Sequence, residues 1–135
     1  MTTVITFGTY DLFHIGHLRL LTRARALGDR LVVGVSTDEL NFSKKGFKPV
    51  FPFADRLEII RALSCVDAAF AEESLEQKGD YIKAHQADIL VMGDDWRGKF
   101  DHLSALCRVT YLPRTEDISA TAIKEHIVRA GIKYI

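Results

Sequence analysis

The stretch Gly8-Thr9-Tyr10-Asp11-Leu12-Phe13-His14-Ile15-Gly16-His17 decides the fold, because a strand pattern precedes it and a helix pattern follows it. The run of β-branched and aromatic residues at 3–7 is typical of a buried strand. Apolar residues at helical spacing continue to Leu27, and we expect Gly28 to supply the helix C-cap. The segment is therefore predicted to be a strand, a tight loop and a helix.

The paired histidines favour an anion site at the start of that helix. Unpaired backbone N–H groups and the helix dipole make a helix N-terminus suitable for phosphate. His14 and His17 are three positions apart, so they lie on one side of the helix, and Gly16 lets the backbone approach a ligand. A lone histidine there is more often a cap or a solvated residue. This pair instead indicates donors to a phosphoryl centre whose negative charge rises during displacement.

The composition excludes several classes of function. The 135 residues suit one domain, 1–135, and 18 basic residues balance 18 acidic ones, which argues against nucleic acid as a partner. We find no signal-peptide pattern and no apolar run long enough to cross a bilayer. Cys65 and Cys107 lack metal-ligand spacing, so we expect buried free thiols. These features predict a cytoplasmic protein without membrane insertion.

Further strands are expected at 31–36, 68–71, 89–92 and 108–112, with helix patterns between them. Strand, helix and strand in this order form a right-handed βαβ unit. The sequence therefore predicts an α/β fold, a Rossmann-like doubly wound parallel sheet of about five strands flanked by helices. Ligands bind at the carboxyl ends of such strands, where both the histidine loop and Asp38 fall.

A lysine-rich segment follows the second strand. Residues 41–49 have no clear period, and we expect a loop that carries Lys44, Lys45 and Lys48. Loop lysines are usually only a solvated surface, but a lysine is also a flexible point charge that can follow a triphosphate. The residues alone leave open which of these three lysines contacts phosphate.

The second half of the chain offers another anion site. Residues 53–63 are expected to form an amphipathic helix. A further helix should begin near Ser74, where Gly79 interrupts it at a cost of roughly 1 kcal/mol relative to alanine. Ser119 is a natural N-cap for the last helix, and Arg114 stands shortly before it. Because a guanidinium binds phosphate oxygens bidentately, this helix start is a second candidate phosphate site.

Three segments carry a resemblance to a known family. The HxGH sequence preceded by Gly-Thr-Tyr-Asp resembles the signature of the HxGH nucleotidyltransferase superfamily, and GTYDLFHIGH is most similar to its cytidylyltransferases. GDDWRGKFD at 93–101 is close to the form found in enzymes that act on glycerol 3-phosphate, and RTEDISAT at 114–121 resembles R-T-x-G-I-S-T-T. The resemblance covers nearly the whole chain and implies a fold of the nucleotidyltransferase type. It also implies transfer of CMP from CTP to sn-glycerol 3-phosphate, giving pyrophosphate and CDP-glycerol, a precursor of envelope polymers such as teichoic acid or capsule.

The resemblance also implies roles for individual residues. Four would be catalytic: His14, His17, Lys44 and Arg114. Four would bind the acceptor: Asp38, Lys44, Arg56 and Lys78. The nucleotide would contact Gly8, Thr9, Tyr10, Asp11, His14, Gly16, His17, Lys48, Gly93, Asp95, Trp96, Arg114, Thr115, Ile118, Ser119, Ala120 and Thr121. Mg²⁺ would arrive on the nucleotide phosphates without a protein metal cage, and the family implies a homodimer.

The chain departs from the family pattern at three positions. Ser64 stands where cytidylyltransferases commonly carry an arginine before an aromatic-Val-Asp segment, and the nearest arginine is Arg61. Asp117 replaces a glycine, which removes easy access to positive φ, and Ala120 replaces a threonine, which removes a hydroxyl. Three alternatives stay open: another acceptor such as phosphoethanolamine or phosphocholine, an adenylyltransferase of the same superfamily, and a non-catalytic nucleotide-binding protein.

Overall fold

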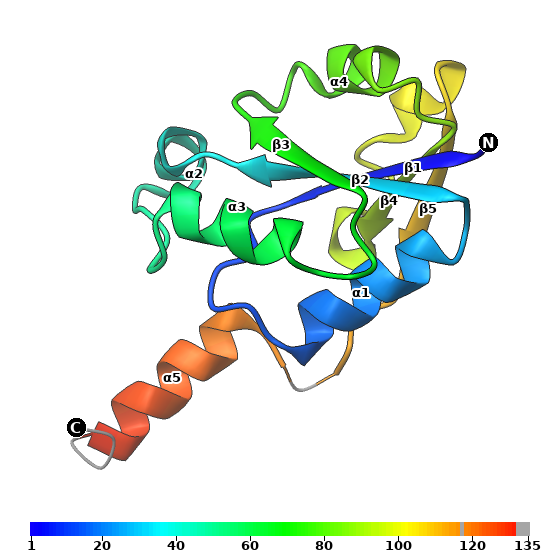
Figure 1. The fold of residues 1–135 in the computed structure, drawn as a ribbon. Coiled ribbons are helices and arrows are strands. Elements are labelled where there is room, and N and C mark those ends of the chain that lie inside the picture. Colours follow the sequence, from blue (N-terminus) through cyan, green and yellow to red (C-terminus); the bar gives the residue numbers. More distant parts are fainter. Residues whose placement is uncertain (117, 132–135) are drawn as a thin grey trace.

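Five parallel strands form the centre of the fold. The computed structural model describes residues 1–116 and 118–131, and its strands are β1 (Thr3–Gly8), β2 (Arg30–Ser36), β3 (Ala68–Glu72), β4 (Ile89–Gly93) and β5 (Arg108–Leu112). Their order in the sheet is β3-β2-β1-β4-β5, and every neighbouring pair is parallel (Figure 1). The predicted α/β fold with a doubly wound parallel sheet is confirmed.

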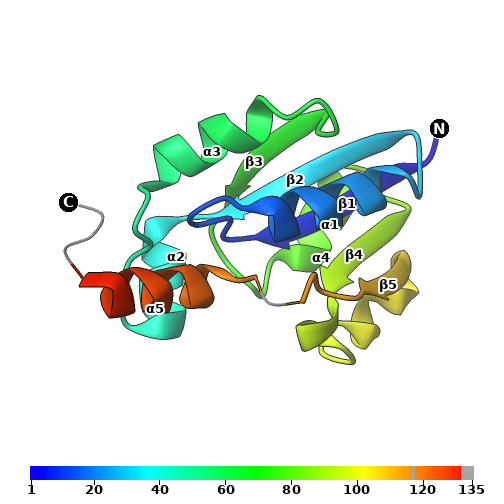
Figure 2. The ribbon, with the colours of Figure 1, turned by 90° about the horizontal axis from the view of Figure 1, so that it is seen from below.

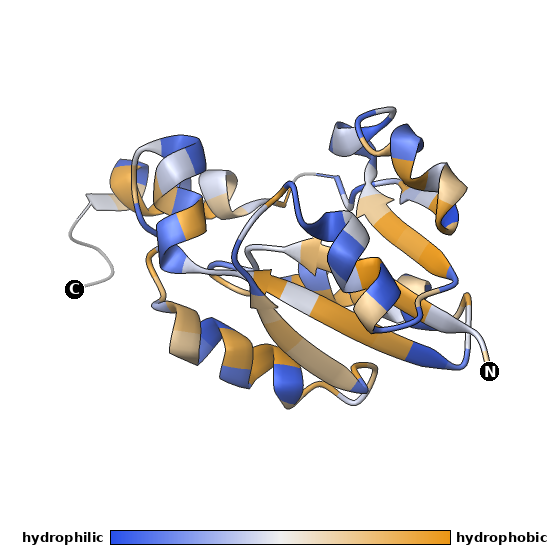
Figure 3. Ribbon diagram, turned by 90° about the horizontal axis from the view of Figure 1, so that it is seen from above, coloured by the Kyte–Doolittle hydropathy of each residue, from blue (hydrophilic) through white to orange (hydrophobic). Residues whose placement is uncertain are grey.

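Helices cover both faces of this sheet. α1 (Ile15–Arg25) and α3 (Phe53–Arg61) lie on one face, and α4 (Lys78–Ala84) lies on the other (Figures 1 and 2). Successive strand residues point to opposite faces, so Val4 packs in the core cluster under α1 and α3, while Ile5 packs in the cluster under α4. Figure 3 shows apolar residues along the strands, between helices that carry hydrophilic residues. Two apolar layers therefore hold the strands in place.

The winding of the chain reverses between β1 and β4. β1 pairs with β2 on one side and β4 on the other, so Thr6 lies between Val33 and Val91. Thr6 Oγ1 donates a hydrogen bond of 2.6 Å to the carbonyl of Val91 across this join. At such a switch point the loops that leave the two strands diverge and open a crevice at the carboxyl edge of the sheet. The histidine loop and the segment after Gly93 leave the sheet at this crevice.

The expected loop at 41–49 is wrong in its first half, because α2 (Asp38–Lys45) occupies it. The side chain of Thr37 accepts a hydrogen bond from a backbone amide of the first turn and caps the helix start. Gly46 ends the helix in the left-handed conformation, with φ 80°. These are ordinary cap signals, and they mark this helix better than its apolar spacing does.

The end of α1 also differs from the expectation. The helix ends at Arg25 with Ala26 as the C-cap, so Gly28 is not the cap residue. A Cβ atom at Gly28 would lie 2.7 Å from the carbonyl oxygen of Thr2. Close packing against the start of β1, and not helix termination, accounts for this glycine.

α4 begins at Lys78 rather than near Ser74, so Gly79 falls in its first turn and does not interrupt it. Two short 3-10 helices that the sequence did not predict follow β4: η1 (Asp94–Trp96) and η2 (Asp101–Ala105). They lie on the same face of the sheet as α4, where Leu103 of η2 belongs to the apolar core and Trp96 of η1 packs against it.

The last helix, α5 (Ala120–Ala130), begins where it was predicted. Ser119 Oγ accepts a hydrogen bond of 3.0 Å from the amide of Ala122, which confirms the N-cap. The helix projects from the body of the fold, and none of its residues is buried (Figures 1 and 2). Cys65 and Cys107 are free, as predicted, but are half-buried. Among the helices of residues 1–116 and 118–131, none is both long and apolar enough to cross a membrane.

Candidate functional site

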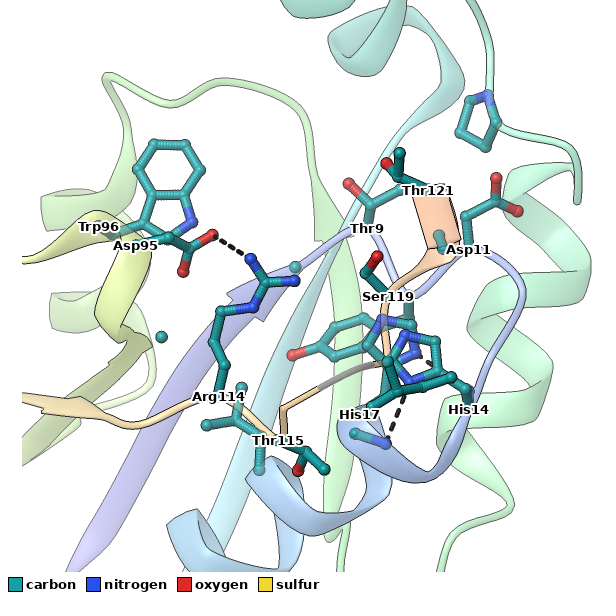
Figure 4. A pocket seen from close by; sticks show the side chains of 18 of the residues that line it. Thr9, Asp11, His14, His17, Asp95, Trp96, Arg114, Thr115, Ser119 and Thr121 are labelled. Carbon is teal, nitrogen blue, oxygen red and sulfur yellow. Dashed lines mark hydrogen bonds and ion pairs between the residues drawn. The ribbon is translucent and has the colours of Figure 1, made fainter. Parts of the chain in front are cut away.

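A cavity of about 390 Å³ opens at the carboxyl ends of β1 and β4. Its walls come from the histidine loop, the segment after β4, the start of α5, and α2 with the loop after it. Figure 4 shows side chains from these segments converging on one space. The lining contains these predicted site residues: Gly8, Thr9, Tyr10, Asp11, His14, Gly16, His17, Gly93, Asp95, Trp96, Arg114, Thr115, Ile118, Ser119, Ala120 and Thr121.

His14 and His17 cap the first turn of α1 reciprocally. His14 Nδ1 accepts a hydrogen bond of 3.0 Å from the amide of Gly16, and His17 Nδ1 accepts one of 3.2 Å from the amide of His14. The two rings stack with centroids 3.8 Å apart and planes at 23°. Because both Nδ1 atoms accept, each neutral ring carries its proton on Nε2. Capping and ligand binding are therefore compatible, since each histidine still offers one Nε2–H donor.

The surroundings keep both imidazoles neutral. Burial lowers the pKa of His17 to about 4, with the nearby His14 and Arg114 acting in the same direction and Asp11 opposing them. Burial and Arg114 also lower the pKa of His14. Neutral rings donate hydrogen bonds to an anion without the cost of keeping a charge in a desolvated place.

Asp11 ties the histidine loop to the segment before α3. Its carboxylate is 6% exposed and accepts hydrogen bonds from the amides of Val50, at 2.7 Å, and Phe51, at 2.9 Å. The residues on either side, Tyr10 with φ 57° and Leu12 with φ 49°, are left-handed. That conformation costs a non-glycine residue about 1–2 kcal/mol. The bonds to Asp11 therefore hold a strained loop in the shape that presents the histidines.

Arg114 and the start of α5 form the opposite wall. The guanidinium of Arg114 lies 3.9 Å from Asp95 Oδ2, and both side chains are half exposed (Figure 4). Next to Asp95, the ring of Trp96 packs against Phe100 with centroids 5.5 Å apart. Because residues 119–121 line the cavity, the N-terminus of α5 borders the same space as the N-terminus of α1. Two helix N-termini and an arginine at one cavity make it an anion site.

Gly16 brings the two helix starts together. A Cβ atom at this position would lie 2.8 Å from His14 Cε1 and 3.2 Å from Ile118 Cγ2. A larger residue would therefore push against the first histidine and against the residue before the N-cap of α5. The glycine lets the two halves of the site pack against each other.

Five predicted residues are not in the cavity lining: Asp38, Lys44, Lys48, Arg56 and Lys78. Arg56 is only 1% exposed and donates hydrogen bonds of 2.8 Å to the carbonyls of Thr9 and Ser36 and to Asp38 Oδ1. Burial raises the pKa of Asp38, but the bonds from Arg56 and from the amide at position 53 outweigh it and leave the pKa below its ordinary value. Arg56 and Asp38 join the ends of β1 and β2 to α3, which gives both a structural role; their contact with the acceptor stays a prediction.

Lys78 and Lys44 lie near a carboxylate at the same edge of the sheet. Lys78 is buried and forms an ion pair with Glu72, the last residue of β3. Its Nζ lies 4.3 Å from the centroid of the Phe7 ring, and Phe7 lines the cavity. Lys44 is half-buried on α2; burial lowers its pKa and the charge of Glu72 opposes this. Lys48, by contrast, is exposed.

The cavity lining also contains Asn41 and Lys124, which sequence reasoning missed, and Lys45, which it named in the lysine-rich segment without assigning a role. Lys45 follows Lys44 on a helix, where each residue turns by about 100°, so the two side chains point in different directions. Lys124 lies on α5, and its Nζ is 3.8 Å from Asp11 Oδ2 on the histidine loop. Recognising α2 as a helix and following the helical period of α5 would have indicated all three.

The departures from the family pattern fall in different places. Ala120 is the first residue of α5 and lines the cavity, whereas Asp117 lies outside the described residues. Arg61 ends α3 and donates a hydrogen bond of 3.2 Å to the carbonyl of Ala69; it does not line the cavity. Within residues 1–116 and 118–131, no group of three or more His, Cys, Asp or Glu side chains is placed to hold a metal ion.

Comparison with known proteins, by sequence and by structure, places the chain in one family. The profile described as cytidylyltransferase-like matches residues 5–126. Glycerol-3-phosphate cytidylyltransferase of Bacillus subtilis is 51% identical over 127 residues, covering 94% of this chain and 98% of the relative. The protein of the same name from Staphylococcus aureus is 45% identical over 94% of this chain and 96% of the relative. The crystal structure of a lipopolysaccharide core biosynthesis protein from Thermoplasma volcanium superimposes with a TM-score of 0.72 at 26% identity, covering 86% of this chain and 99% of that one.

Proposed function

The chain belongs to the cytidylyltransferase-like family, and we propose that it transfers CMP from CTP to sn-glycerol 3-phosphate, giving CDP-glycerol and pyrophosphate. The observation that carries this proposal is the cavity in which two neutral histidines at the start of α1 lie opposite Arg114 and the start of α5. The two relatives are glycerol-3-phosphate cytidylyltransferases, and their activity suggests the two substrates.

The reaction is an in-line displacement at the α-phosphorus of CTP. A phosphate oxygen of glycerol 3-phosphate bonds to the α-phosphorus while the bond to the oxygen that bridges to the β-phosphorus breaks. Pyrophosphate leaves with that oxygen and its electron pair. Negative charge grows on the transferred phosphoryl group, and the Nε2–H groups of His14 and His17 stabilise it. The chain needs no nucleophile of its own.

The triphosphate is assigned to the cations and helix ends that line the cavity. Arg114 offers a planar guanidinium, Lys45 adds a point charge from α2, and Lys124 adds one from α5. The N-terminus of α5 adds backbone donors. Asp95 and Trp96, at the other end of the cavity, are assigned to the cytidine part of the nucleotide.

The acceptor phosphate is assigned to Lys44 and Lys78. This follows the family resemblance, and it is supported by the position of Lys78 behind the Phe7 ring that lines the cavity. The charge of Glu72 raises the pKa of both lysines and so favours the charged forms that bind phosphate. Acceptor and nucleotide would then approach each other along the carboxyl edge of the sheet.

Magnesium is proposed to enter as part of the CTP substrate. When bound to the triphosphate it draws negative charge from the leaving pyrophosphate. The two carboxylates in the cavity lining are already engaged, Asp11 with backbone amides and Asp95 with Arg114. A cation carried by the nucleotide fits this arrangement better than one held by side chains.

The proposed reaction is tested by incubating the chain with MgCl2, CTP and glycerol 3-phosphate, and by measuring pyrophosphate and CDP-glycerol. Parallel reactions replace glycerol 3-phosphate with phosphoethanolamine or phosphocholine, and CTP with ATP. Formation of CDP-glycerol at the highest kcat/KM is the expected result. Faster turnover of another acceptor, or of ATP, would overturn the substrate assignment. The proposed nucleotidyl transfer in the cavity would still hold.

The roles of the histidines are tested by single substitutions. His14→Ala and His17→Ala each remove one Nε2–H donor, and each should lower kcat by about 10²–10³-fold. His102→Ala is the matched control, because His102 is exposed on η2 and does not line the cavity. Circular dichroism checks that each variant is folded. Unchanged kcat in a folded His14 or His17 variant would remove the proposed mechanism.

We further propose that the chain forms a homodimer in the cytoplasm. Large apolar side chains are exposed on α5, at Ile127 and Val128, and around the end of α2, at Phe42, Phe47 and Val50. Exposed apolar groups of this size favour a subunit contact. The cytoplasmic location follows from the supply of CTP inside the cell. Sedimentation of the purified chain tests the dimer.

A further inference from the structure

A buried ion pair lies behind the wall of the cavity. Glu72 ends β3 and is 1% exposed, and Lys78 begins α4 and is 3% exposed. Their side chains are hydrogen-bonded to each other. Removing two charges from water is costly, and an apolar pair of similar size is often at least as stable. The position of this pair therefore needs a reason other than stability.

The ammonium group of Lys78 is enclosed by aromatic rings next to the cavity. Its Nζ lies 4.3 Å from the centroid of Phe7 and 5.2 Å from the centroid of Phe100. These rings attract the lysine only while it is charged. Burial lowers the pKa of Lys78, and the charges of Glu72 and Glu76 oppose that change. Glu72 is the nearer of the two carboxylates, because it bonds directly to the ammonium group.

The charge of Glu72 also acts on Lys44, which comes from a second helix. Burial lowers the pKa of Lys44, the charge of Glu72 raises it, and Lys45, Lys78 and Arg56 lower it further. The carbonyl of Glu72 accepts a hydrogen bond of 3.1 Å from the amide of the N-cap residue of α2. The backbone thus fixes the end of β3 against the helix that carries Lys44. Glu72 therefore bonds to Lys78 from α4 through its carboxylate and is fixed to the start of α2, the helix of Lys44, through its carbonyl.

We propose that Glu72 is a positioning residue for the acceptor, whose carboxylate keeps Lys78 charged and in place to bind, together with Lys44, the phosphate of glycerol 3-phosphate. The inference rests on the proposed function, because it concerns how that acceptor is held. Two lysines and one glutamate carry a net charge of about +1, so a phosphate can be attracted without breaking the bond between Glu72 and Lys78. Glu72 itself touches neither substrate in this assignment.

Glu72→Gln removes the charge and retains a hydrogen-bond acceptor. Burial is then unopposed by that carboxylate, so the pKa of Lys78 falls and the lysine loses its proton at a lower pH. Relative to the unsubstituted chain, the KM of Glu72→Gln for glycerol 3-phosphate should rise with increasing pH, by about tenfold for each unit by which the pKa of Lys78 falls. The KM for CTP should change less than about twofold across the same pH range.

Two further variants separate positioning from folding. Glu73→Gln is the matched control, since Glu73 is the exposed neighbour of Glu72, and it should leave both KM values unchanged at every pH. Glu72→Gln combined with Lys78→Met removes both buried charges and preserves the packing between the aromatic rings. This double variant should fold, bind CTP normally and show a raised KM for glycerol 3-phosphate at every pH. A purely structural role for Glu72 predicts instead a lower melting temperature with no pH-dependent change in KM.

A measurement without turnover keeps the inference independent of the substrate assignment. The ¹³Cε resonance of Lys78, assigned with Lys78→Arg, is titrated in the unsubstituted chain and in Glu72→Gln. A pKa lower by about one unit or more in Glu72→Gln supports the inference, and equal pKa values overturn it. Absence of CDP-glycerol formation by the unsubstituted chain overturns the proposed function alone. Turnover with identical pH profiles in both chains overturns the role of Glu72 alone.

Discussion

Replacing Arg56 with methionine should destabilise the fold far more than it weakens any substrate contact. Arg56 is 1% exposed and donates to the carbonyls of Thr9 and Ser36 at 2.8 Å and of Phe51 at 3.0 Å, and it pairs with Asp38 at 2.8 Å. It therefore connects the end of β1, the end of β2 and the start of α3. Methionine fills much of the same volume but offers no donor, so these oxygens lose a partner.

The expected loss can be estimated from the contacts. A buried carbonyl left without a donor costs about 1–3 kcal/mol, and Arg56 donates to three carbonyls; the lost pair with Asp38, whose side chain is 23% exposed, adds less than the about 3–5 kcal/mol of a fully buried pair. These contributions overlap because one side chain makes them all. We therefore expect the free energy of unfolding to fall by about 3–5 kcal/mol, which is a large part of the about 5–15 kcal/mol typical of a domain.

Urea denaturation followed by far-ultraviolet circular dichroism measures this loss. Arg61→Met is the matched control on the same helix, because Arg61 is exposed and makes a single hydrogen bond of 3.2 Å to Ala69. It should cost less than about 1 kcal/mol. An Arg56→Met variant with the original stability and a raised KM for the acceptor would refute the structural reading and restore the acceptor contact that the family resemblance implied.

Three further predictions concern the histidine loop. The pKa of His17 is about 4 in the folded chain and about 6.5 in the unfolded chain, so folding favours the neutral imidazole. The free energy of unfolding should therefore fall by roughly 3 kcal/mol from pH 7 to pH 4. In acid titrations of stability, His17→Gln should remove most of that fall. Tyr10 Oη is buried and has no hydrogen-bond partner among the described residues, so Tyr10→Phe should keep activity and leave the unfolding free energy within about 1 kcal/mol; a loss above about 2 kcal/mol contradicts this. Gly16→Ala should press on His14 and Ile118, lower stability by about 1–3 kcal/mol and raise the KM for CTP, and an unchanged KM would argue against the close packing of the two helix starts.

The strands were predictable because their signal is local. Continuous apolar runs such as 31–36 and 89–92 appear in the sheet with the order that a doubly wound fold requires. α2 was missed because it is short and its evidence lies in its caps, Thr37 and Gly46, and not in apolar spacing. The start of α4 was predicted too early, because nothing in the sequence at 74–77 shows that the helix begins only at Lys78.

The site was predictable where a motif carries it and unpredictable where side-chain direction decides. The rule for parallel strands placed the histidine loop at the carboxyl edge, and the segment at 114–121 was predicted as a second phosphate site; the structure brings both around one cavity. Lys44 and Lys45 are equivalent in the sequence, and only the rotation of α2 distinguishes them. Arg56 was predicted as an acceptor ligand from the family resemblance, and nothing in the sequence showed that tertiary packing buries this arginine.

The carboxyl edge of the sheet is held by charges that bond to backbone. Asp11 accepts from two amides before α3, Arg56 donates to three carbonyls, and Glu72 bonds to Lys78 while its own carbonyl binds the start of α2. Apolar groups alone cannot line an anion site, because bound phosphate needs hydrogen-bond donors. The loops that present those donors also contain backbone groups that need hydrogen-bond partners. Buried charges satisfy those backbone groups at a desolvation cost that apolar packing elsewhere in the sheet offsets. The same reasoning explains why the strain at Tyr10 is tolerated at this edge, where Asp11 fixes the loop from its neighbouring position.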